Sequence, residues 1–293
     1  MKDASLRVLI TGAGGQLGKA LIATAPPGTV LRCVTHAELD VAEPAAVAAV
    51  FRDLAPQLVL NAAAFTAVDD AERTPAAAQR TNTTGPAVLS AACATGGTWL
   101  THVSTDYVFD GAQSWPYDTG ARPQPLSVYG RTKLAGETAV LEQLPQASTV
   151  VRASWLYSAH GGFAARMLTL MRSRPQLSIV ADQVGAPTSA HGLAQVLWSL
   201  SARRATGLWH WCDSGVASWY DFAVAIAETA VELELLATAP AITPIASADY
   251  PTAAARPPYS VLDKRATENL LGITAPHWRS ALRTTLAGLA NAE

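Results

Sequence analysis

The first half of the chain alternates short apolar runs with longer, alanine-rich segments of helical character. The short runs predict strands over residues 6–10, 30–34, 58–61, 98–103 and 149–153. The longer segments predict helices over residues 16–25, 44–54, 74–95 and 128–143. Strands that are apolar throughout and are separated by helical crossovers pair in parallel and are buried on both faces. The pattern therefore predicts an α/β fold with a doubly wound parallel sheet.

The regular alternation of predicted strands and helices ends at about residue 154. A strand is predicted over residues 177–180, helices are predicted over 189–201 and 218–237, and the proline- and alanine-rich stretch 239–258 is predicted to be irregular. Long irregular segments in compact domains are usually functional or disordered. We therefore predict a doubly wound domain over residues 1–154 and a smaller α/β domain over 155–293, some of whose helices could pack back onto the first.

The composition restricts the kinds of partner. Hydrophobic residues make up 49% of the 293 residues and the formal net charge is −2, which gives no electrostatic basis for binding nucleic acid or an anionic membrane. No apolar stretch approaches the roughly 18–20 residues of a membrane span, and the apolar run at 6–10, interrupted by Arg7, is too short for the core of a signal peptide. Cys33, Cys93 and Cys212 form no close pair. Reduced thiols, and hence a cytoplasmic protein, are the simplest interpretation.

A glycine-rich turn follows the first predicted strand. Gly12, Gly15 and Gly18 lie between strand 6–10 and helix 16–25. Glycines at such a turn allow a tight bend, close approach of the backbone to a pyrophosphate, and close packing of helix on strand. The helix N-terminus then offers free N–H groups to the phosphates. The position predicts a Rossmann-like NAD(P) site, the alternative being an ordinary glycine-rich turn.

The residues indicate less clearly whether the cofactor carries the 2′-phosphate that distinguishes NADP from NAD. The GxxGxxG spacing resembles the short-chain dehydrogenase/reductase superfamily. An acidic residue at the end of the second strand would favour NAD, but no acid occurs there before Glu38, and Arg32 is near. We therefore predict that NADP(H) is bound, with NADH possible as a second cofactor, and that Asp40 and Val41 meet the adenine end.

Tyr129 and Lys133 are four residues apart on predicted helix 128–143, and hence on one face a turn apart. Free tyrosine, with a pKa of about 10, is a slow acid at neutral pH. A nearby ammonium favours the phenolate, so we expect Lys133 to lower the pKa of Tyr129. The pair suits acid catalysis of hydride transfer, the alternative being a surface contact.

Hydroxyl groups follow the fourth predicted strand, which runs into Ser104 and Thr105. Reactive groups of doubly wound sheets collect at the carboxyl ends of strands. A hydroxyl here could hydrogen-bond a substrate carbonyl beside Tyr129, or it could simply end the strand.

Together these motifs resemble the dTDP-4-dehydrorhamnose reductases, extended short-chain reductases of nucleotide-sugar metabolism. The resemblance spans nearly the whole chain. The strings STDYVFDG at 104–111 and DQVGAPT at 182–188 are more specific than the glycine loop or the YxxxK pair. Further matching segments lie at residues 12–18, 61–69, 129–136 and 152–157.

The resemblance implies that hydride passes from NADPH, or from NADH, to C4 of dTDP-4-dehydro-L-rhamnose to give dTDP-L-rhamnose. In that reaction Tyr129 protonates the developing alkoxide, Lys133 holds the nicotinamide ribose, and Thr105 hydrogen-bonds near the reacting oxygen. The implied cofactor contacts, besides the Tyr129 and Lys133 pair, are Gly12, Gly15, Gln16, Leu17, Asp40, Val41, Ala63, Ala64 and Thr66.

The implied substrate contacts are Thr105, Asp106, Trp155 and Arg256. Arg256 would suit the diphosphate but could equally be a solvent-exposed arginine, and Trp155 could be a core aromatic. Asn82 is either the superfamily's supporting asparagine or a helix-surface residue.

Two segments depart from the family. His160-Gly161-Gly162-Phe163 stands where relatives often carry asparagines, which puts contacts to the sugar nucleotide there in doubt. Residues 189–192 carry no carboxylate, so we predict no metal-linked dimer and no bound metal. The choice between monomer and homodimer stays open.

Two other functions remain. One is a reductase of a related dTDP-4-keto-6-deoxysugar. The other is a non-catalytic NADP-binding regulatory subunit similar to that of methionine adenosyltransferase. An intact set of Thr105, Tyr129 and Lys133 favours an enzyme, because a pure binding module would not require all three.

Overall fold

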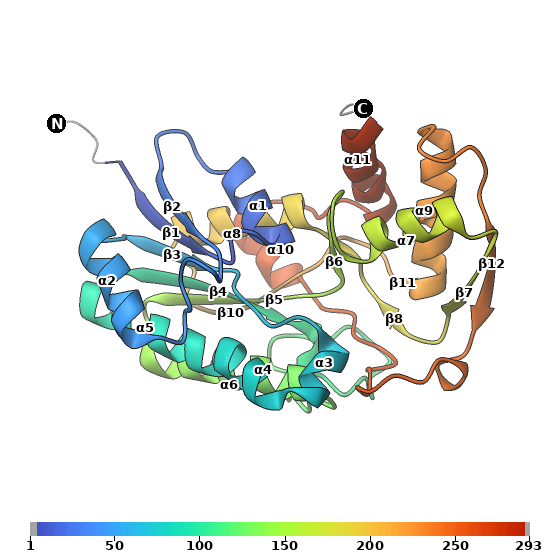
Figure 1. Cartoon of the computed structure of the whole chain (residues 1–293). Coiled ribbons are helices and arrows are strands. Elements are labelled where there is room, and N and C mark those ends of the chain that lie inside the picture. The colour runs from blue at the N-terminus through green and yellow to red at the C-terminus, as the bar shows by residue number, and fades with distance from the viewer. Residues whose placement is uncertain (1–4, 291–293) are drawn as a thin grey trace.

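A six-stranded parallel sheet forms the centre of the protein in a computed structural model that describes residues 5–290 (Figure 1). The strand order is β10-β5-β4-β3-β1-β2, and every pairing in this sheet is parallel. The predicted doubly wound α/β class is confirmed. The strands are β1 (Arg7–Thr11), β2 (Val30–Val34), β3 (Leu58–Asn61), β4 (Trp99–Thr105), β5 (Ser148–Ala153) and β10 (Gly207–Trp211).

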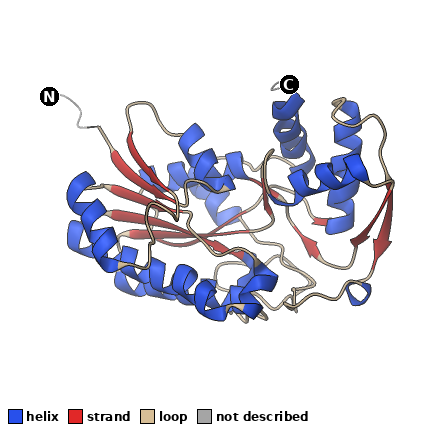
Figure 2. Ribbon diagram, viewed as in Figure 1, coloured by secondary structure: helices blue, strands red, loops and turns tan. Residues whose placement is uncertain are grey.

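Helices cover both faces of the sheet (Figures 1 and 2). On one face lie α2 (Pro44–Leu54), α5 (Gly85–Gly96) and α6 (Val128–Gln143). On the other lie α1 (Gln16–Ala23), α8 (Ala190–Ala202) and α10 (Arg265–Leu271). This arrangement buries the apolar strands from both sides, as their sequences predict.

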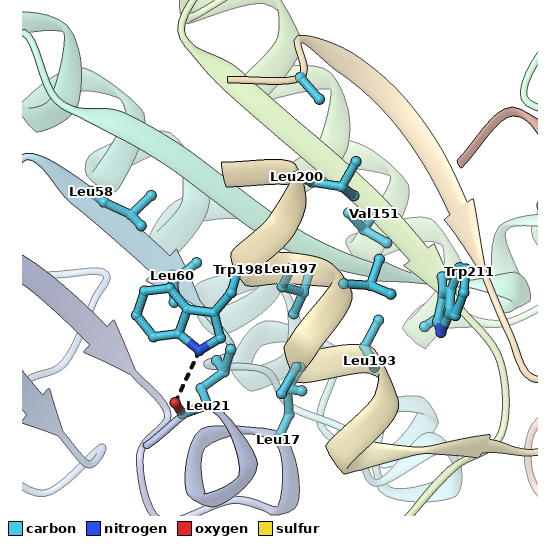
Figure 3. Close-up of a cluster of buried hydrophobic side chains, with 14 of the residues drawn as sticks. Leu17, Leu21, Leu58, Leu60, Val151, Leu193, Leu197, Trp198, Leu200 and Trp211 are labelled. Atoms are coloured by element: carbon cyan, nitrogen blue, oxygen red, sulfur yellow. Dashed lines mark hydrogen bonds between the residues drawn. The ribbon is translucent and has the colours of Figure 1, made fainter. Parts of the chain in front are cut away.

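The second half of the chain contributes a strand and helices to the main sheet and its covering layers. β10 pairs with β5 at the edge of the sheet, and α8 packs beside α1. Leu193 and Leu197 of α8 lie in the same buried cluster as Leu21 of α1 (Figure 3). The indole of Trp198 also donates a hydrogen bond to the carbonyl oxygen of Leu21 at 3.1 Å. The main sheet therefore crosses the boundary that we predict near residue 154.

The remaining elements of the second half form a separate layer beside the sheet (Figure 1). Helices α7 (Gly162–Ser173), α9 (Trp219–Glu232) and α11 (Trp278–Ala290) pack around a buried core that includes Phe222 and Met167. α9 begins with a capping box, in which Ser218 and Asp221 satisfy each other's backbone N–H groups. The short strands of this half are β6 (Leu156–Tyr157), β7 (Gln176–Val180), β8 (Val184–Gly185), β9 (Thr188–Ser189), β11 (Ala217–Ser218) and β12 (Ala241–Ile245).

One prediction of local structure is confirmed and another was wrong. The predicted helix 74–95 is a continuous helical segment over residues 75–96, in which a π-helical turn η1 (Arg80–Thr84) joins α4 (Pro75–Gln79) to α5; a separate helix α3 (Val68–Arg73) precedes it. The stretch 239–258 is not wholly irregular, because β12 pairs in parallel with β7. β12 has one partner and contains a proline, as edge strands can.

Within the described part of the chain, no helix has both the length and the apolar character needed to cross a bilayer.

Candidate active site

The glycine loop has the shape that a dinucleotide needs. Gly12 has a φ of +70°, and a Cβ atom there would lie 2.6 Å from the carbonyl carbon of Ala62. A Cβ atom at Gly18 would lie 2.2 Å from the carbonyl oxygen of Gly12, so only glycine lets α1 pack this closely on the loop. Gly15 caps α1 without a side chain. The first N–H groups of the helix thus remain available to an anion.

Gln16 and Leu17 are the first residues of α1. Leu17 is buried in the core, so only its backbone could contact a cofactor. The Gln16 side chain lies under the loop before α7, where a Cβ at Gly161 or Gly162 would come within 2.6 or 2.9 Å of it. The absence of side chains at Gly161 and Gly162 therefore lets this loop cover Gln16.

The loop between β3 and α3 carries Ala63, Ala64 and Thr66. Its start is fixed by Asn61 at the end of β3. The Oδ1 of Asn61 accepts hydrogen bonds from the Thr11 hydroxyl at 2.7 Å and from the Ala63 N–H at 3.2 Å. The loop thus begins next to the glycine turn at the carboxyl edge of the sheet, where ligands of doubly wound folds bind.

Asn82 fixes the middle of the same loop. Its Oδ1 accepts from the Phe65 N–H at 2.8 Å, and its Nδ2 donates to the Phe65 carbonyl at 3.1 Å and to the Thr132 hydroxyl of α6 at 3.2 Å. Asn82 is fully buried in η1, so it is not a helix-surface residue. π-Helical turns are often found at functional sites.

Asp40 and Val41 precede α2. The pKa of Asp40 is lowered by hydrogen bonds from the Ala42 N–H and from Arg80, whose guanidinium donates to it at 2.9 and 3.0 Å. Val41 is buried against Gly85. The carboxylate of Asp40 is thus held by Ala42 and Arg80, while only the backbone of Val41 is available to a ligand.

Tyr129 and Lys133 lie on α6, as predicted. The helix starts at Ser127, whose hydroxyl accepts a hydrogen bond from the Gly130 N–H at 3.1 Å. A Cβ at Gly130 would lie 2.2 Å from the Tyr107 carbonyl oxygen, so Gly130 lets α6 lie directly against η2 (Asp106–Val108), the turn that follows β4. The first turn of α6 is thereby held at the end of β4.

Lys133 is nearly buried, with 2% of its surface exposed. Its Nζ donates to the carbonyl oxygen of Val103 on β4 at 2.7 Å. Burial lowers the pKa of Lys133 to about 8, and the carboxylate of Glu137 opposes this shift. An ammonium has three donors, so two remain for a ligand.

Burial raises the pKa of Tyr129 to about 12, although the Thr105 hydroxyl acts in the opposite direction. The lowered Tyr129 pKa that we expected from Lys133 is therefore wrong, because desolvation of the phenolate is the largest effect and Lys133 is not among the groups that shift this pKa. At neutral pH Tyr129 holds its proton. Its ring also makes an edge contact with Tyr107, at 5.7 Å between centroids.

Thr105 ends β4 and Asp106 begins η2. The Thr105 hydroxyl donates to Asp106 Oδ1 at 3.1 Å and accepts from the Tyr107 N–H at 3.2 Å. Burial raises the pKa of Asp106 to about 6, against hydrogen bonds from Ser260 and Thr105. The strand end thus carries a hydroxyl, a perturbed carboxyl group and, through α6, a protonated tyrosine.

Trp155 lies between β5 and β6 with a φ of +45°, in the left-handed region. Its ring stacks on Trp219, with centroids 3.5 Å apart and planes at 3°. A Cβ at Gly185 would lie 2.4 Å from the Trp155 ring, so the DQVGAPT segment packs directly on it. The Trp219 indole in turn donates to Gln183 Oε1 at 3.2 Å. Trp155 is therefore part of an aromatic pair held by that motif.

Arg256 is not a free surface arginine. Its guanidinium donates to both oxygens of Asp69, at 2.7 and 3.3 Å, and Asp69 also accepts from the Ala254 N–H. Burial lowers the pKa of Arg256, but hydrogen bonds to Asp69 and Tyr107 outweigh it and leave the pKa raised. The pair links the segment before α10 to the N-terminal turn of α3.

A cavity of about 350 Å³ adjoins Arg256. The DQVGAPT segment contributes one wall and the segment around Ser247 the other, and the two are joined because Gln183 Nε2 donates to the Ser247 hydroxyl at 2.9 Å. Among its lining residues are Asp182, Gln183, Ser247, Tyr250, Arg256 and Pro258.

Known proteins resemble the chain over nearly its whole length. The family model described as "RmlD substrate binding domain" matches residues 6–291. A dTDP-4-dehydrorhamnose reductase of Mycobacterium tuberculosis (strain CDC 1551 / Oshkosh) is 41% identical over 300 residues, covering 99% of this chain and 96% of the relative. The chain belongs to the dTDP-4-dehydrorhamnose reductase family. The resemblance drawn from its motifs is confirmed, and so is the enzyme class, an oxidoreductase of this family.

Two further relatives carry the name of a substrate or a cofactor in their own descriptions. A Streptomyces niveus protein named dTDP-4-keto-6-deoxy-D-glucose reductase is 37% identical over 279 residues, covering 94% of this chain and 95% of the relative. The crystal structure of a Bacillus anthracis dTDP-4-dehydrorhamnose reductase, in complex with NADP, superposes with a TM-score of 0.91 at 32% identity. That match covers 97% of this chain and all of the other.

The reductase fold brings most of the predicted site residues to one edge of the sheet. The glycine loop, the loop 62–67, Thr105, Asp106 and the Tyr129–Lys133 face all lie at the carboxyl ends of β1, β3 and β4. Trp155 and Arg256 lie on segments that pack against this edge from the second half. Among residues 5–290, no group of three metal-binding side chains comes together.

Sequence reasoning on this reductase missed several neighbours of the site. Trp219 and Gln183 define the position of Trp155, and Asp69 holds Arg256. Gln183 and Asp69 lie in the family-like segments 182–188 and 61–69, which marked them as candidates. The neighbouring sequence does not indicate that they contact Trp219 and Arg256. Trp219 carried no signal, because its contact joins residues far apart in the chain.

Proposed function

We propose that this protein reduces the C4 keto group of dTDP-4-dehydro-L-rhamnose with NADPH to give dTDP-L-rhamnose. The observation that carries the proposal is the assembly of Thr105, Tyr129 and Lys133 at the carboxyl end of β4, in a chain of this reductase family. The substrate class is supported by the relatives' names, since one is a dTDP-4-dehydrorhamnose reductase.

The residues of the glycine loop fit a dinucleotide. Gly12 and Gly18 leave space that a Cβ would fill, and Gly15 leaves the first N–H groups of α1 without a side-chain cap. Those N–H groups would hold the pyrophosphate. NADPH, when bound, supplies the hydride. The NADP complex of the B. anthracis relative supports this cofactor, and we propose that NADH is also accepted.

The protein's own contribution is to hold the substrate and provide a proton. Tyr129 keeps its proton at neutral pH, because burial raises its pKa to about 12, and it is the donor to O4 as negative charge develops there. Thr105 donates a second hydrogen bond to the same oxygen once its hydroxyl, which has one hydrogen, turns away from Asp106. Lys133, fixed to Val103, uses its remaining donors to hold the nicotinamide ribose.

The sugar nucleotide is proposed to lie between Tyr129 and the cavity beside Arg256. Asp106 and Trp155 flank the sugar, while Arg256 faces the diphosphate. Because Asp69 already engages both sides of the Arg256 guanidinium, a diphosphate must share the guanidinium with that carboxylate or displace it.

A related keto-sugar is the second candidate substrate, since one relative of similar identity is named dTDP-4-keto-6-deoxy-D-glucose reductase. The deciding experiment is an assay of NADPH and NADH consumption at 340 nm across a small panel of nucleotide-linked 4-keto-6-deoxysugars. We expect the greatest kcat/KM with dTDP-4-dehydro-L-rhamnose and NADPH. Turnover confined to another keto-sugar would replace the proposed substrate, and no turnover of any of them would point to a binding protein.

A further inference from the structure

Glu137 and Arg152 form a buried ion pair next to the catalytic helix face. Their side chains are only 2% and 3% exposed, respectively. Arg152 Nε donates to Glu137 Oε1 at 2.9 Å, and Nη2 donates to Oε2 at 2.7 Å. Burying two charges costs several kcal/mol per ion, so such a pair is weak evidence of stabilisation. Its position indicates a different purpose.

Glu137 lies one helical turn after Lys133 on the same buried face of α6. Lys133 is as well buried as Glu137, and its Nζ is held by the Val103 carbonyl of β4. Arg152 lies on the neighbouring strand β5, where it pairs in register with Ser104. The three side chains therefore place charge in the order positive, negative, positive between α6 and β5.

We propose that Glu137 is a positioning residue of the reductase: fixed by Arg152, its carboxylate is the buried counter-ion that keeps Lys133 protonated. Lys133 needs that proton to donate to ribose hydroxyls, and this functional consequence rests on the proposed hydride transfer. The electrostatic relationship itself does not depend on the substrate. Arg152 in turn prevents Glu137 from folding onto Lys133 and taking over its free donors.

The other titratable groups around Lys133 do not replace this counter-ion. On β4, burial holds the pKa of His102 well below its usual value, so His102 is neutral. On η2, Asp106 is engaged with Thr105, and burial raises the pKa of Tyr107, which keeps it neutral. Tyr129 on α6 is also protonated. Among the described residues, Glu137 is the charged group that raises the pKa of Lys133.

Arg152 is held in place independently of Glu137. Its guanidinium lies 5.1 Å from the centroid of Phe109, and Nη1 lies 3.5 Å from His210 Nε2. Burial lowers the pKa of His210 to about 4, and its Nδ1 pairs with the Tyr117 carbonyl. If Glu137 lost its charge, two cations would remain in this region with no buried anion between them.

The experiment titrates the ammonium of Lys133 directly by NMR in protein labelled with [¹³Cε]lysine. The chain has only four lysines, the others being Lys2, Lys19 and Lys264, and Lys133→Met assigns the Lys133 signal by its loss. We expect a pKa of about 8 in the wild type. Glu137→Gln alone would leave the Arg152 guanidinium buried without its ion-pair partner, which destabilises the fold. The test variant is therefore the double substitution Glu137→Gln/Arg152→Met.

In the double variant we expect the pKa of Lys133 to fall by about one unit, because the carboxylate that raises this pKa is lost together with its partner guanidinium. Glu137→Asp keeps the charge and should leave the titration near that of the wild type. NADPH affinity, followed by nucleotide fluorescence, should decrease as the pH rises and Lys133 loses its proton. In the double variant this decrease should begin at a lower pH than in the wild type, in parallel with the titration. A folded double variant whose Lys133 titrates as in the wild type would overturn the proposal. Failure of the wild type to bind NADPH, with the titration shifted as expected, would instead count against the proposed function.

Discussion

Asn82 and the backbone of Phe65 exchange two hydrogen bonds, one in each direction, at 2.8 and 3.1 Å. The same amide donates to Thr132, the residue directly before Lys133 on α6. One buried side chain thus ties the loop proposed to contact the cofactor to the helix that carries the acid.

Asn82→Ala should therefore weaken cofactor binding more than it weakens chemistry. The change leaves an N–H and a carbonyl of Phe65 without their partners, which should lower the free energy of unfolding by about 2 kcal/mol. The KM for NADPH should rise several-fold, with a smaller loss in kcat. Urea unfolding and steady-state kinetics measure the two effects. Thr138→Ala, on the exposed face of α6, is the matched control and should change neither.

Tyr129→Phe tests the assigned acid. Removal of the hydroxyl should lower kcat about 100-fold or more, because proton donation to the alkoxide is lost, while the Kd for NADPH stays within about a factor of three. Stopped-flow hydride transfer and cofactor fluorescence separate the two quantities. Turnover close to that of the wild type would remove Tyr129 from the mechanism.

Gly185→Ala should disturb the substrate site without touching the cofactor site. The added methyl would lie 2.4 Å from the Trp155 ring, which is already stacked on Trp219 and has little room to move. Overpacking of this kind typically costs about 1–3 kcal/mol, so we expect the KM for the sugar nucleotide to rise about tenfold or more. Gly288→Ala on α11, where a methyl group meets nothing within 4 Å, is the control. Equal effects of the two substitutions would argue against a role for Trp155.

Asp213 should make stability depend on pH. Its carboxyl group is fully buried and accepts from the Ser189 N–H at 3.0 Å, and burial raises its pKa to about 7. The folded protein thus holds a proton that the unfolded chain releases near pH 4. The free energy of unfolding should therefore fall as pH rises from about 4 to about 7 and then level off.

Asp213→Asn keeps an acceptor for Ser189 but cannot ionise. Its stability relative to the wild type should therefore increase between pH 5 and pH 8, by a few kcal/mol at most. Urea midpoints at the two pH values measure the change. A constant difference between variant and wild type would show that Asp213 is ionised at both.

The sequence was sufficient where local pattern and tertiary environment agree. Strands β1 to β5 and helices α1, α2 and α6 lie within two residues of their predicted bounds, because their apolar runs are buried by neighbouring crossovers. β10 could not be predicted, since Gly207–Trp211 becomes a strand only by pairing with β5, more than fifty residues earlier. The π-helical turn at Arg80–Thr84 was also not predicted, because nothing in the local sequence indicates that Gly136 of α6 packs on the Asn82 backbone there.

The site shows the same division. Tyr129, Lys133 and Thr105 could be proposed as site residues from a spacing and a strand end, and their proximity follows from the topology. The pKa of Tyr129 could not be predicted, because the cost of burying its phenolate depends on packing that no motif encodes. The pairing of Arg256 with Asp69 likewise joins residues that are 187 positions apart in the chain.

In the proposed reaction, hydride passes to C4 of the sugar while Tyr129 supplies the proton. The most direct test uses NADPH carrying deuterium at both C4 positions of the nicotinamide, with dTDP-4-dehydro-L-rhamnose as substrate and NMR of the product. We expect one deuterium atom at C4 of the deoxyhexose and none elsewhere on the ring. A product without deuterium at C4, or with the label at another carbon, would contradict the proposed reaction.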